Sequence, residues 1–261
     1  MKRLFKFCAL FLLMGLCALP GFAASAQEVY EGADVSVWQG DIDFSKVRDA
    51  GMEIVYIRAG EGMEEDLRFR QNAQEALDAG LKVGFYYFVT AADAQQARQQ
   101  ADYFTSLIED YPYGCRPAVD YEQFGDLSRE QINDVALAFA QRVEENTNVT
   151  PLFYTDYANV EGLWDQALAR YPLWVADYSQ TDLGSLGPWD EWAGFQYSDQ
   201  GEVAGIDGAV DLDRFTSAAL MPQSPAPPQT GDPFPVAAAF GVGCAALAAA
   251  LTGYRRKARN L

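Results

Sequence analysis

The spacing of short apolar runs over residues 29–220 constrains the fold more than any other feature of this 261-residue chain. Segments with helical periodicity separate the early runs, and almost none separates the late ones. Strands that alternate with helices run parallel, and eight of them favour a closed barrel. The eight candidate strands lie within residues 32–38, 52–60, 81–89, 116–122, 150–155, 171–179, 192–198 and 209–215.

Five helices are predicted between these strands. Ser128 and Gln131 form a capping box at the start of the fourth helix, and Gly51 and Gly80 lie where helix C-caps are expected. We therefore expect an α/β barrel related to the (β/α)₈ fold but without its last helices. An open doubly wound sheet is the alternative, but no Gly-rich phosphate loop follows the first strand. The predicted helices span 43–50, 65–79, 92–111, 129–146 and 157–171.

Residues 1–26 have the order of a secretory signal peptide. Lys2, Arg3 and Lys6 precede an apolar block over residues 7–19, and a small-residue site at 24–26 follows. We expect signal peptidase to cleave before Gln27. An N-terminal membrane anchor is the alternative, but the apolar block is shorter than the ~20 residues that a span needs.

The other end of the chain resembles the cell-wall sorting signal of Gram-positive bacteria. A Pro-rich linker at 221–229 leads into the predicted signal at 227–261, which combines Pro-Pro-Gln-Thr-Gly, about 20 apolar residues and a basic tail. The resemblance implies that a sortase cleaves between Thr230 and Gly231 and links the chain to the wall. Pro227 replaces the commoner Leu, which indicates a variant sortase specificity. A retained membrane helix, with the domain facing outside, is the alternative.

Removal of both ends makes the chain strongly acidic. The removed parts carry seven of the 19 basic residues and one of the 37 acidic ones, which leaves a net charge of −24. This charge argues against nucleic acid or anionic lipid as a partner. A solvated extracellular surface accounts for it. We expect residues 27–220 to be one monomeric domain.

The absence of histidine restricts the possible chemistry. It excludes Ser-His-Asp and Cys-His catalysis and His-ligated zinc. Cys115 is the one cysteine outside the removed ends, so it cannot form an intrachain disulfide, and we expect a packing role. The remaining carboxylates suit glycoside cleavage, which ordinarily uses a carboxylic acid and a second carboxylate. No metal or organic cofactor is implied.

Four carboxylates are candidates for that chemistry. Asp120 and Glu122 end the fourth strand and, two residues apart, share one face about 7 Å apart. Asp34 lies in the first strand and Asp211 in the last. These two strands are neighbours in a closed barrel, so all four groups could face one pocket. A solvated strand end is the alternative for any one of them in so acidic a chain.

Aromatic residues near the strand ends predict a sugar-binding groove, because sugar rings present C–H faces to aromatic planes. Alternate aromatics in strands are also typical of a core, and Tyr87 and Trp174 are open to that interpretation. The predicted substrate-binding residues are Tyr86, Tyr154, Trp174, Tyr178 and Gln196.

Seven sequence blocks follow one another over residues 33–215. They are DVSVWQGDIDF (34–44), YIRAGEG (56–62), DLRFRQNAQEALDAGLKVGFYYF (66–88), PAVDYE (117–122), PLFYT (151–155), LWVADYS (173–179) and GFQYSDQGEVAGIDGAVDL (194–212). In this order the blocks resemble glycoside hydrolase family 25, the muramidases of the Chalaropsis lysozyme type. The resemblance implies a flattened (β/α)₅β₃ barrel that hydrolyses the β-1,4 bond from N-acetylmuramic acid to N-acetylglucosamine in peptidoglycan glycan strands.

Position by position, the resemblance assigns roles to the four carboxylates. Glu122 matches the general acid, and Asp120 matches the carboxylate that assists the 2-acetamido group or acts as base. Asp34 and Asp211 match two further acidic residues of the site.

Two positions depart from the family pattern. Tyr86-Tyr87 replaces a common Tyr-His pair, and Asp213 replaces an Asn, where it would raise carboxyl pKa values if it faced the groove. A non-catalytic, wall-anchored peptidoglycan-binding protein on an inactive scaffold is therefore the alternative function.

Overall fold

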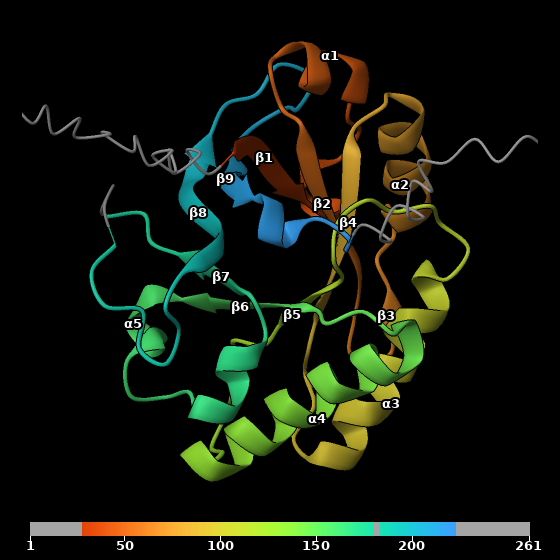
Figure 1. The fold of residues 1–261 in the computed structure, drawn as a ribbon. Coiled ribbons are helices and arrows are strands. Elements are labelled where there is room, and N and C mark those ends of the chain that lie inside the picture. Colours follow the sequence, from red (N-terminus) through yellow and green to blue (C-terminus); the bar gives the residue numbers. More distant parts are fainter. Residues whose placement is uncertain (1–27, 180–182, 223–261) are drawn as a thin grey trace, which may run out of the picture. The chain divides into compact units, whose positions relative to one another are not determined.

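The computed structural model describes residues 28–179 and 183–222, and the described residues up to Met221 form one compact unit. The predicted signal peptide and sorting signal lie outside the described residues. Within the described parts, eight strands form a barrel, and a two-residue strand, β3, pairs with the end of β2 (Figure 1). The strands are β1 (Val29–Val35), β2 (Ile54–Glu61), β3 (Glu64–Glu65), β4 (Lys82–Phe88), β5 (Ala118–Asp120), β6 (Leu152–Asp156), β7 (Leu173–Ala176), β8 (Trp192–Gly201) and β9 (Val210–Thr216).

The first barrel strand closes the ring, because it pairs with both β2 and β9. The pairing with β2 is parallel and the pairing with β9 is antiparallel. From β2 through β4 to β8 every neighbouring pair is parallel, and β9 runs antiparallel to β8 as well. The expected barrel of eight mostly parallel strands is confirmed, and the open-sheet alternative is wrong.

Five helices connect the first six barrel strands and lie outside the ring, as expected for (β/α)₅β₃ (Figure 1). The Ser128–Gln131 capping box is present, and Gly51 and Gly80 have the positive φ values of C-cap residues. No helix in the described parts is long and apolar enough to cross a membrane. The helices are α1 (Phe44–Asp49), α2 (Phe69–Asp78), α3 (Ala94–Ile108), α4 (Arg129–Thr147) and α5 (Tyr157–Val160).

Three predicted helices are shorter than expected by five residues or more. The third was expected over 92–111 but spans Ala94–Ile108. The fifth was expected over 157–171, but α5 ends at Val160 and a 3₁₀ helix follows at Gln166–Arg170. Gly162 between them has a φ of 95°, which a continuous right-handed helix cannot contain. The second was expected from residue 65 but begins at Phe69, because Asp66 accepts hydrogen bonds from the backbone of Val37 and Arg68 and holds this segment in a turn.

Alternation along the strands separates two hydrophobic cores. Val55, Val119 and Val175 point outward into the core between barrel and helices. Alternate residues point inward, where Tyr56, Trp174 and Phe215 fill the barrel. The inner faces of Gly84 and Gly194 leave room for these rings, since a Cβ at Gly194 would lie 2.7 Å from Trp174 Cδ1. The predicted core role of Tyr87 and packing role of Cys115 are confirmed, because both are fully buried in these cores.

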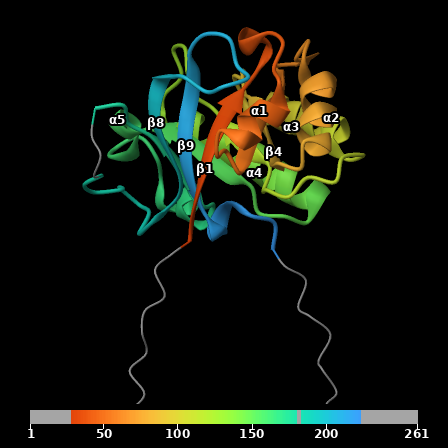
Figure 2. The same ribbon diagram turned by 90° about the horizontal axis from the view of Figure 1, so that it is seen from above.

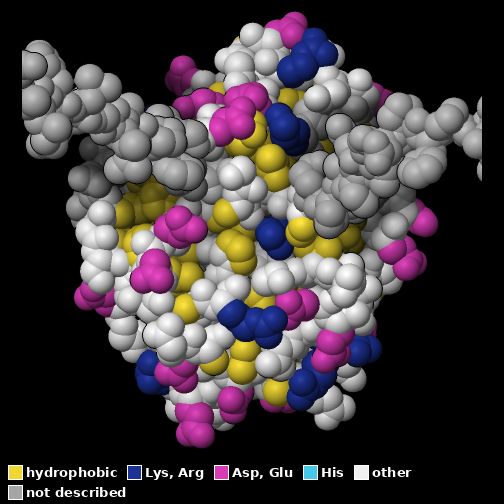
Figure 3. Space-filling view, viewed as in Figure 1, with side chains coloured by type: hydrophobic (Ala, Val, Ile, Leu, Met, Phe, Trp, Pro, Cys, Tyr) yellow, Lys and Arg dark blue, Asp and Glu magenta, His cyan; other side chains and the backbone are white. Residues whose placement is uncertain are grey.

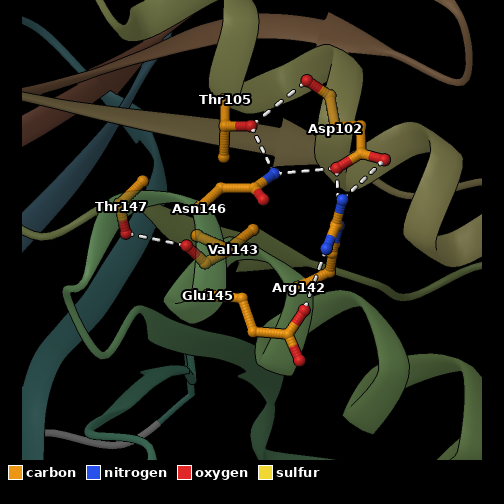
Figure 4. A network of polar contacts seen from close by, with 7 residues as sticks. All are labelled: Asp102, Thr105, Arg142, Val143, Glu145, Asn146 and Thr147. Carbon is orange, nitrogen blue, oxygen red and sulfur yellow. Dashed lines mark hydrogen bonds and ion pairs between the residues drawn. The ribbon is translucent and has the colours of Figure 1, made fainter.

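A polar network joins α3 to α4 on the outside of the barrel (Figure 4). Arg142 donates to both oxygens of Asp102 at 2.6 and 3.3 Å, and Asn146 bridges Asp102 and Thr105. The hydrogen bond from Arg142 lowers the pKa of Asp102. The network is exposed, so it orients the two helices more than it stabilises them.

The two ends of the barrel domain lie together at its base. Val29 at the start of β1 is opposite Thr216 at the end of β9, and a 3₁₀ helix at Ser217–Ala219 follows there. Figure 2 shows β1 and β9 rising side by side from this end. On the face seen in Figure 3, acidic side chains are spread among Lys and Arg side chains. This spread is typical of a solvated acidic surface.

Candidate active site

A pocket of about 500 Å³ opens at the end of the barrel where the parallel strands finish. All four predicted catalytic carboxylates and all five predicted substrate-binding residues contribute to its wall. This is the end at which barrel enzymes carry their reacting groups. The pocket is lined by Asp34, Ser36, Trp38, Gln39, Arg58, Glu61, Tyr86, Phe88, Asp120, Glu122, Gln123, Tyr154, Trp174, Tyr178, Gln196 and Asp211.

Asp120 and Glu122 differ in their exposure within this pocket. Asp120 is the last residue of β5, opposite Tyr154 of β6, and its side chain is buried. Its Oδ1 atom has no hydrogen-bond partner among the described residues. Glu122 lies just beyond the strand and is exposed, while Tyr121 between them points into the outer core. The pair therefore offers one buried and one accessible carboxyl group.

Asp34 and Asp211 are brought together by barrel closure, as predicted. They are direct partners in the antiparallel pairing of β1 with β9. Asp34 is buried and Asp211 is half-buried. Two carboxyl groups on adjacent strands in one pocket repel each other when both are ionised, so the pocket favours proton uptake.

Gln196 of β8 connects the aromatic wall to Asp34. Its Oε1 atom accepts hydrogen bonds from the hydroxyls of Tyr154 at 3.0 Å and Tyr178 at 2.7 Å. Its Nε2 atom donates to Asp34 Oδ2 at 2.6 Å. Because both tyrosines donate to the amide oxygen, the amide nitrogen must face Asp34. This network fixes the Asp34 carboxylate from one side.

Trp174 and Tyr86 form the floor of the pocket rather than its rim. Trp174 is only 2% exposed, and its ring packs against Tyr56, Tyr86, Tyr154 and Phe215 in the inner core. Trp174 is therefore a core residue, as one of the two interpretations expected, and it also forms part of the pocket floor. Tyr178, by contrast, is 50% exposed and stands at the rim.

Asp213 does not line the pocket. It lies beneath the pocket, fully buried, and accepts a hydrogen bond from Trp174 Nε1 at 2.9 Å. The expectation that Asp213 raises carboxyl pKa values applied only if it faced the groove, and it does not face the groove. Its hydrogen bond to Asp34 partly offsets the rise in the pKa of Asp34 that burial and Asp211 cause.

The pocket raises the pKa of each of its four candidate carboxyl groups. Burial is the largest cause for all of them, because a low-dielectric surrounding disfavours the charged form. Neighbouring negative charges add to this effect. The charge of Glu122 raises the pKa of Asp120, and the charge of Asp156 raises the pKa of Glu122. The charge of Asp211 raises the pKa of Asp34. Burial followed by Asp199 raises the pKa of Asp211 to about 6. Protonated carboxyl groups near neutral pH suit general acid catalysis.

Seven lining residues were not among the predicted site residues: Ser36, Trp38, Gln39, Arg58, Glu61, Phe88 and Gln123. Trp38 is 81% exposed in a short 3₁₀ helix after β1, where a large aromatic side chain has no packing role. Arg58 lies in β2 beside Asp66 at 2.9 Å and lowers the pKa of Asp120. A signal for Arg58 was available, since a charged residue inside an apolar strand indicates a site.

The described residues hold no group of three Cys, Asp or Glu side chains arranged to bind a metal ion. The polar groups of the pocket are carboxyl, amide, hydroxyl and guanidinium groups, with aromatic rings between them. A mostly parallel barrel with clustered, pKa-shifted carboxyl groups at its open end defines the site of a glycoside-cleaving enzyme.

The chain belongs to the glycosyl hydrolases family 25, whose family model matches residues 33–206. It is 32% identical over 195 residues to the autolytic lysozyme of Clostridium acetobutylicum, covering 73% of this chain but only 57% of that protein. It is 33% identical over 206 residues to lysozyme M1 of Streptomyces globisporus, covering 72% and 68% of the two chains. The bacterial lysozyme structure from Streptomyces coelicolor is 30% identical, with a TM-score of 0.62, and is matched over 71% of this chain and 91% of that one.

Proposed function

We propose that this protein is a muramidase that hydrolyses the β-1,4 bond between N-acetylmuramic acid and N-acetylglucosamine in peptidoglycan. The observation that carries the proposal is the convergence of Asp34, Asp120, Glu122 and Asp211 on one pocket beside Tyr154 and Tyr178. The similarity to two proteins named lysozymes supports the same substrate class.

Glu122 is the proposed proton donor to the leaving oxygen. Its side chain is exposed in the pocket, so it can reach the glycosidic oxygen of a bound glycan. Burial on the protein side, followed by the charges of Asp156 and Asp211, raises its pKa. A raised pKa keeps the proton on Glu122 at mildly acidic to neutral pH, as a general acid requires.

Asp120 is proposed to stabilise the positive charge that develops as the bond breaks. Burial and Glu122 hold its pKa high in the free enzyme. Its unpartnered Oδ1 atom can accept the N–H of the 2-acetamido group, and this hydrogen bond favours the ionised form. Substrate binding would thus ionise Asp120 and leave the proton on Glu122.

Purified protein tests this proposal through the products released from purified cell walls. We expect wild-type protein to release fragments with muramic-acid reducing ends, identified by mass spectrometry, and Glu122→Gln to release none while it keeps the wild-type melting temperature. Glu130→Gln, in an exposed turn of α4, is the matched control and should stay active. Equal activity of Glu122→Gln and Glu130→Gln would exclude Glu122 as the acid, and inactive wild-type protein would favour a binding role.

The proposed location is the outside of the cell, with the enzyme covalently attached to the wall. The support is the order of motifs at the two ends of the sequence, including Thr230-Gly231. Signal peptidase and a sortase would process the chain. Thr230→Ala should move the protein from the wall fraction to the membrane fraction of expressing cells. An unchanged wall fraction would contradict sortase attachment.

A further inference from the structure

Asp213 is a buried carboxyl group with an unusual set of contacts. Its side chain is fully buried beneath the pocket, and its Oδ1 atom accepts a hydrogen bond from Trp174 Nε1. Its Oδ2 atom accepts no hydrogen bond from any N–H or hydroxyl group of the described residues. A buried ionised carboxylate with one free oxygen is costly, whereas a neutral carboxyl group can use that oxygen as a donor.

The groups around Asp213 are acids, aromatics and one amide. Asp34 of β1 lies diagonally across the strand pairing from Asp213, Gln196 of β8 lies directly opposite it, and Trp174 of β7 donates a hydrogen bond to it. Asp211 is two residues away on β9. An ionised Asp213 would also raise the pKa of Tyr56 in β2 and of Tyr197 in β8. Nearby negative charge and burial both favour a proton on one of the two neighbouring carboxyl groups.

The contacts of Asp34 decide which group carries this proton. Each of the two carboxyl groups accepts one N–H hydrogen bond, Asp34 from Gln196 and Asp213 from Trp174. Asp34 also lines the pocket, where water or substrate can solvate its charge, whereas Asp213 is fully buried and its Oδ2 atom has no partner among the described residues. We propose that Asp213 is a neutral carboxylic acid that donates its proton in a hydrogen bond to Asp34 and so positions the Asp34 carboxylate in the pocket. Asp34 is then held between Gln196 and Asp213.

The electrostatics agree with this direction of donation. Burial first, and then the charge of Asp34, raises the pKa of Asp213 well above its usual value, and the hydrogen bond to Asp34 raises it further. For Asp34 the same hydrogen bond acts in the opposite direction, and together with the one from Gln196 it partly offsets the rise in its pKa that burial and Asp211 cause. Asp213 acts through Asp34, so it is a positioning residue and not a catalytic one.

The first test does not depend on the proposed muramidase activity. A group whose pKa is raised in the folded state stabilises the fold fully below its ordinary pKa near 4, and this stability is lost as the pH rises to its folded pKa. Each pH unit in that window costs up to about a tenfold change in the unfolding equilibrium constant. The Asn side chain in Asp213→Asn has the same shape but does not titrate. The unfolding equilibrium constant of this variant should therefore lack the part of the pH dependence that Asp213 causes.

The measurement is denaturant unfolding of wild-type protein and Asp213→Asn over a series of pH values. The difference between the two should grow with pH above about pH 4 and then level off. Infrared spectra give a direct readout, because each neutral carboxyl group, Glu122 included, contributes a carbonyl band at neutral pH, and the spectrum of Asp213→Asn should lack the one component that belongs to Asp213. The proposal would be overturned if the difference in unfolding free energy between wild-type protein and Asp213→Asn did not change with pH and the two proteins had identical infrared carbonyl bands.

The second test rests on the proposed function and uses the pH profile of cell-wall hydrolysis. The Asn amide supplies a donor at every pH, so Asp213→Asn should be active, and its alkaline loss of activity should follow the ionisation of Glu122 alone and be shallower than that of wild-type protein. Asp213→Leu removes the donor and should lose activity at all pH values. Superimposable profiles of wild-type protein and Asp213→Asn would contradict the positioning role. If wild-type protein has no activity, the proposed function fails, and the unfolding and infrared measurements still decide the protonation of Asp213.

Discussion

Asp34 and Asp211 are paired residue to residue across the two antiparallel strands that close the barrel. One belongs to the first strand and the other to the last, so the pocket is complete only when the ring is closed. The same closure places Asp34 beside Gln196 of β8, which joins it to Tyr154 and Tyr178. The acidic and aromatic sides of the pocket are thus connected through a single amide group.

The first prediction concerns that amide. Gln196→Leu should remove the amide's hydrogen bonds to Asp34 and to two tyrosine hydroxyls, which costs about 1–3 kcal/mol of stability. Without Gln196 the Asp34 carboxyl group should move out of its place in the pocket, which should lower the hydrolysis rate by about a hundredfold. Gln200→Leu, at an exposed position of the same strand, is the control. Rate assays on purified walls and denaturant unfolding give both values, and equal losses in the two variants would contradict the role of Gln196.

The second prediction concerns Asp120. Its pKa is raised in the folded state, so its ionisation destabilises the fold as the pH rises from about 4 toward its folded pKa. Asp120→Asn should therefore be more stable than wild-type protein at neutral pH, by on the order of 1 kcal/mol, and less active. The gain should shrink toward about pH 4. Unfolding at several pH values checks this, and a variant less stable than wild type at neutral pH would refute it.

The third prediction concerns Trp38 at the pocket rim. An exposed indole beside an acidic pocket offers a plane for a sugar ring. Trp38→Ala should raise KM for polymeric glycan about tenfold, which is about 1.4 kcal/mol, with a small effect on kcat. Leu67→Ala is the control, because Leu67 is 90% exposed and does not line the pocket. An unchanged KM would remove Trp38 from the binding surface.

The fourth prediction concerns packing inside the barrel. A Cβ atom at Gly84 would collide with the ring of Tyr56. Gly84→Ala should destabilise the domain by about 1–3 kcal/mol, because the surrounding core cannot shift freely. Gly114→Ala is the matched control, since its Cβ would meet no side-chain atom closer than 4.0 Å. Thermal unfolding followed by circular dichroism compares the two. Similar melting temperatures would show that the barrel interior adapts.

The sequence predicted the fold well because the apolar strands alternate with helices in a regular order. The convergence of Asp34, Asp120 and Asp211 followed from that order, since strand ends meet at one end of a barrel. The end of α5 was predicted poorly, because Gly162 breaks a pattern that is otherwise helical. The Gln196 network and the burial of Asp213 depend on side-chain contacts between distant strands, which periodicity along the chain does not contain.

The base of the barrel bears on how the enzyme meets a solid substrate. β9 ends at Thr216 beside the start of β1, on the face opposite the pocket, and Leu220 lies against Cys115 before β5. The chain therefore leaves the domain behind the pocket. A support joined to the domain at this end would therefore be attached on the face opposite the pocket mouth.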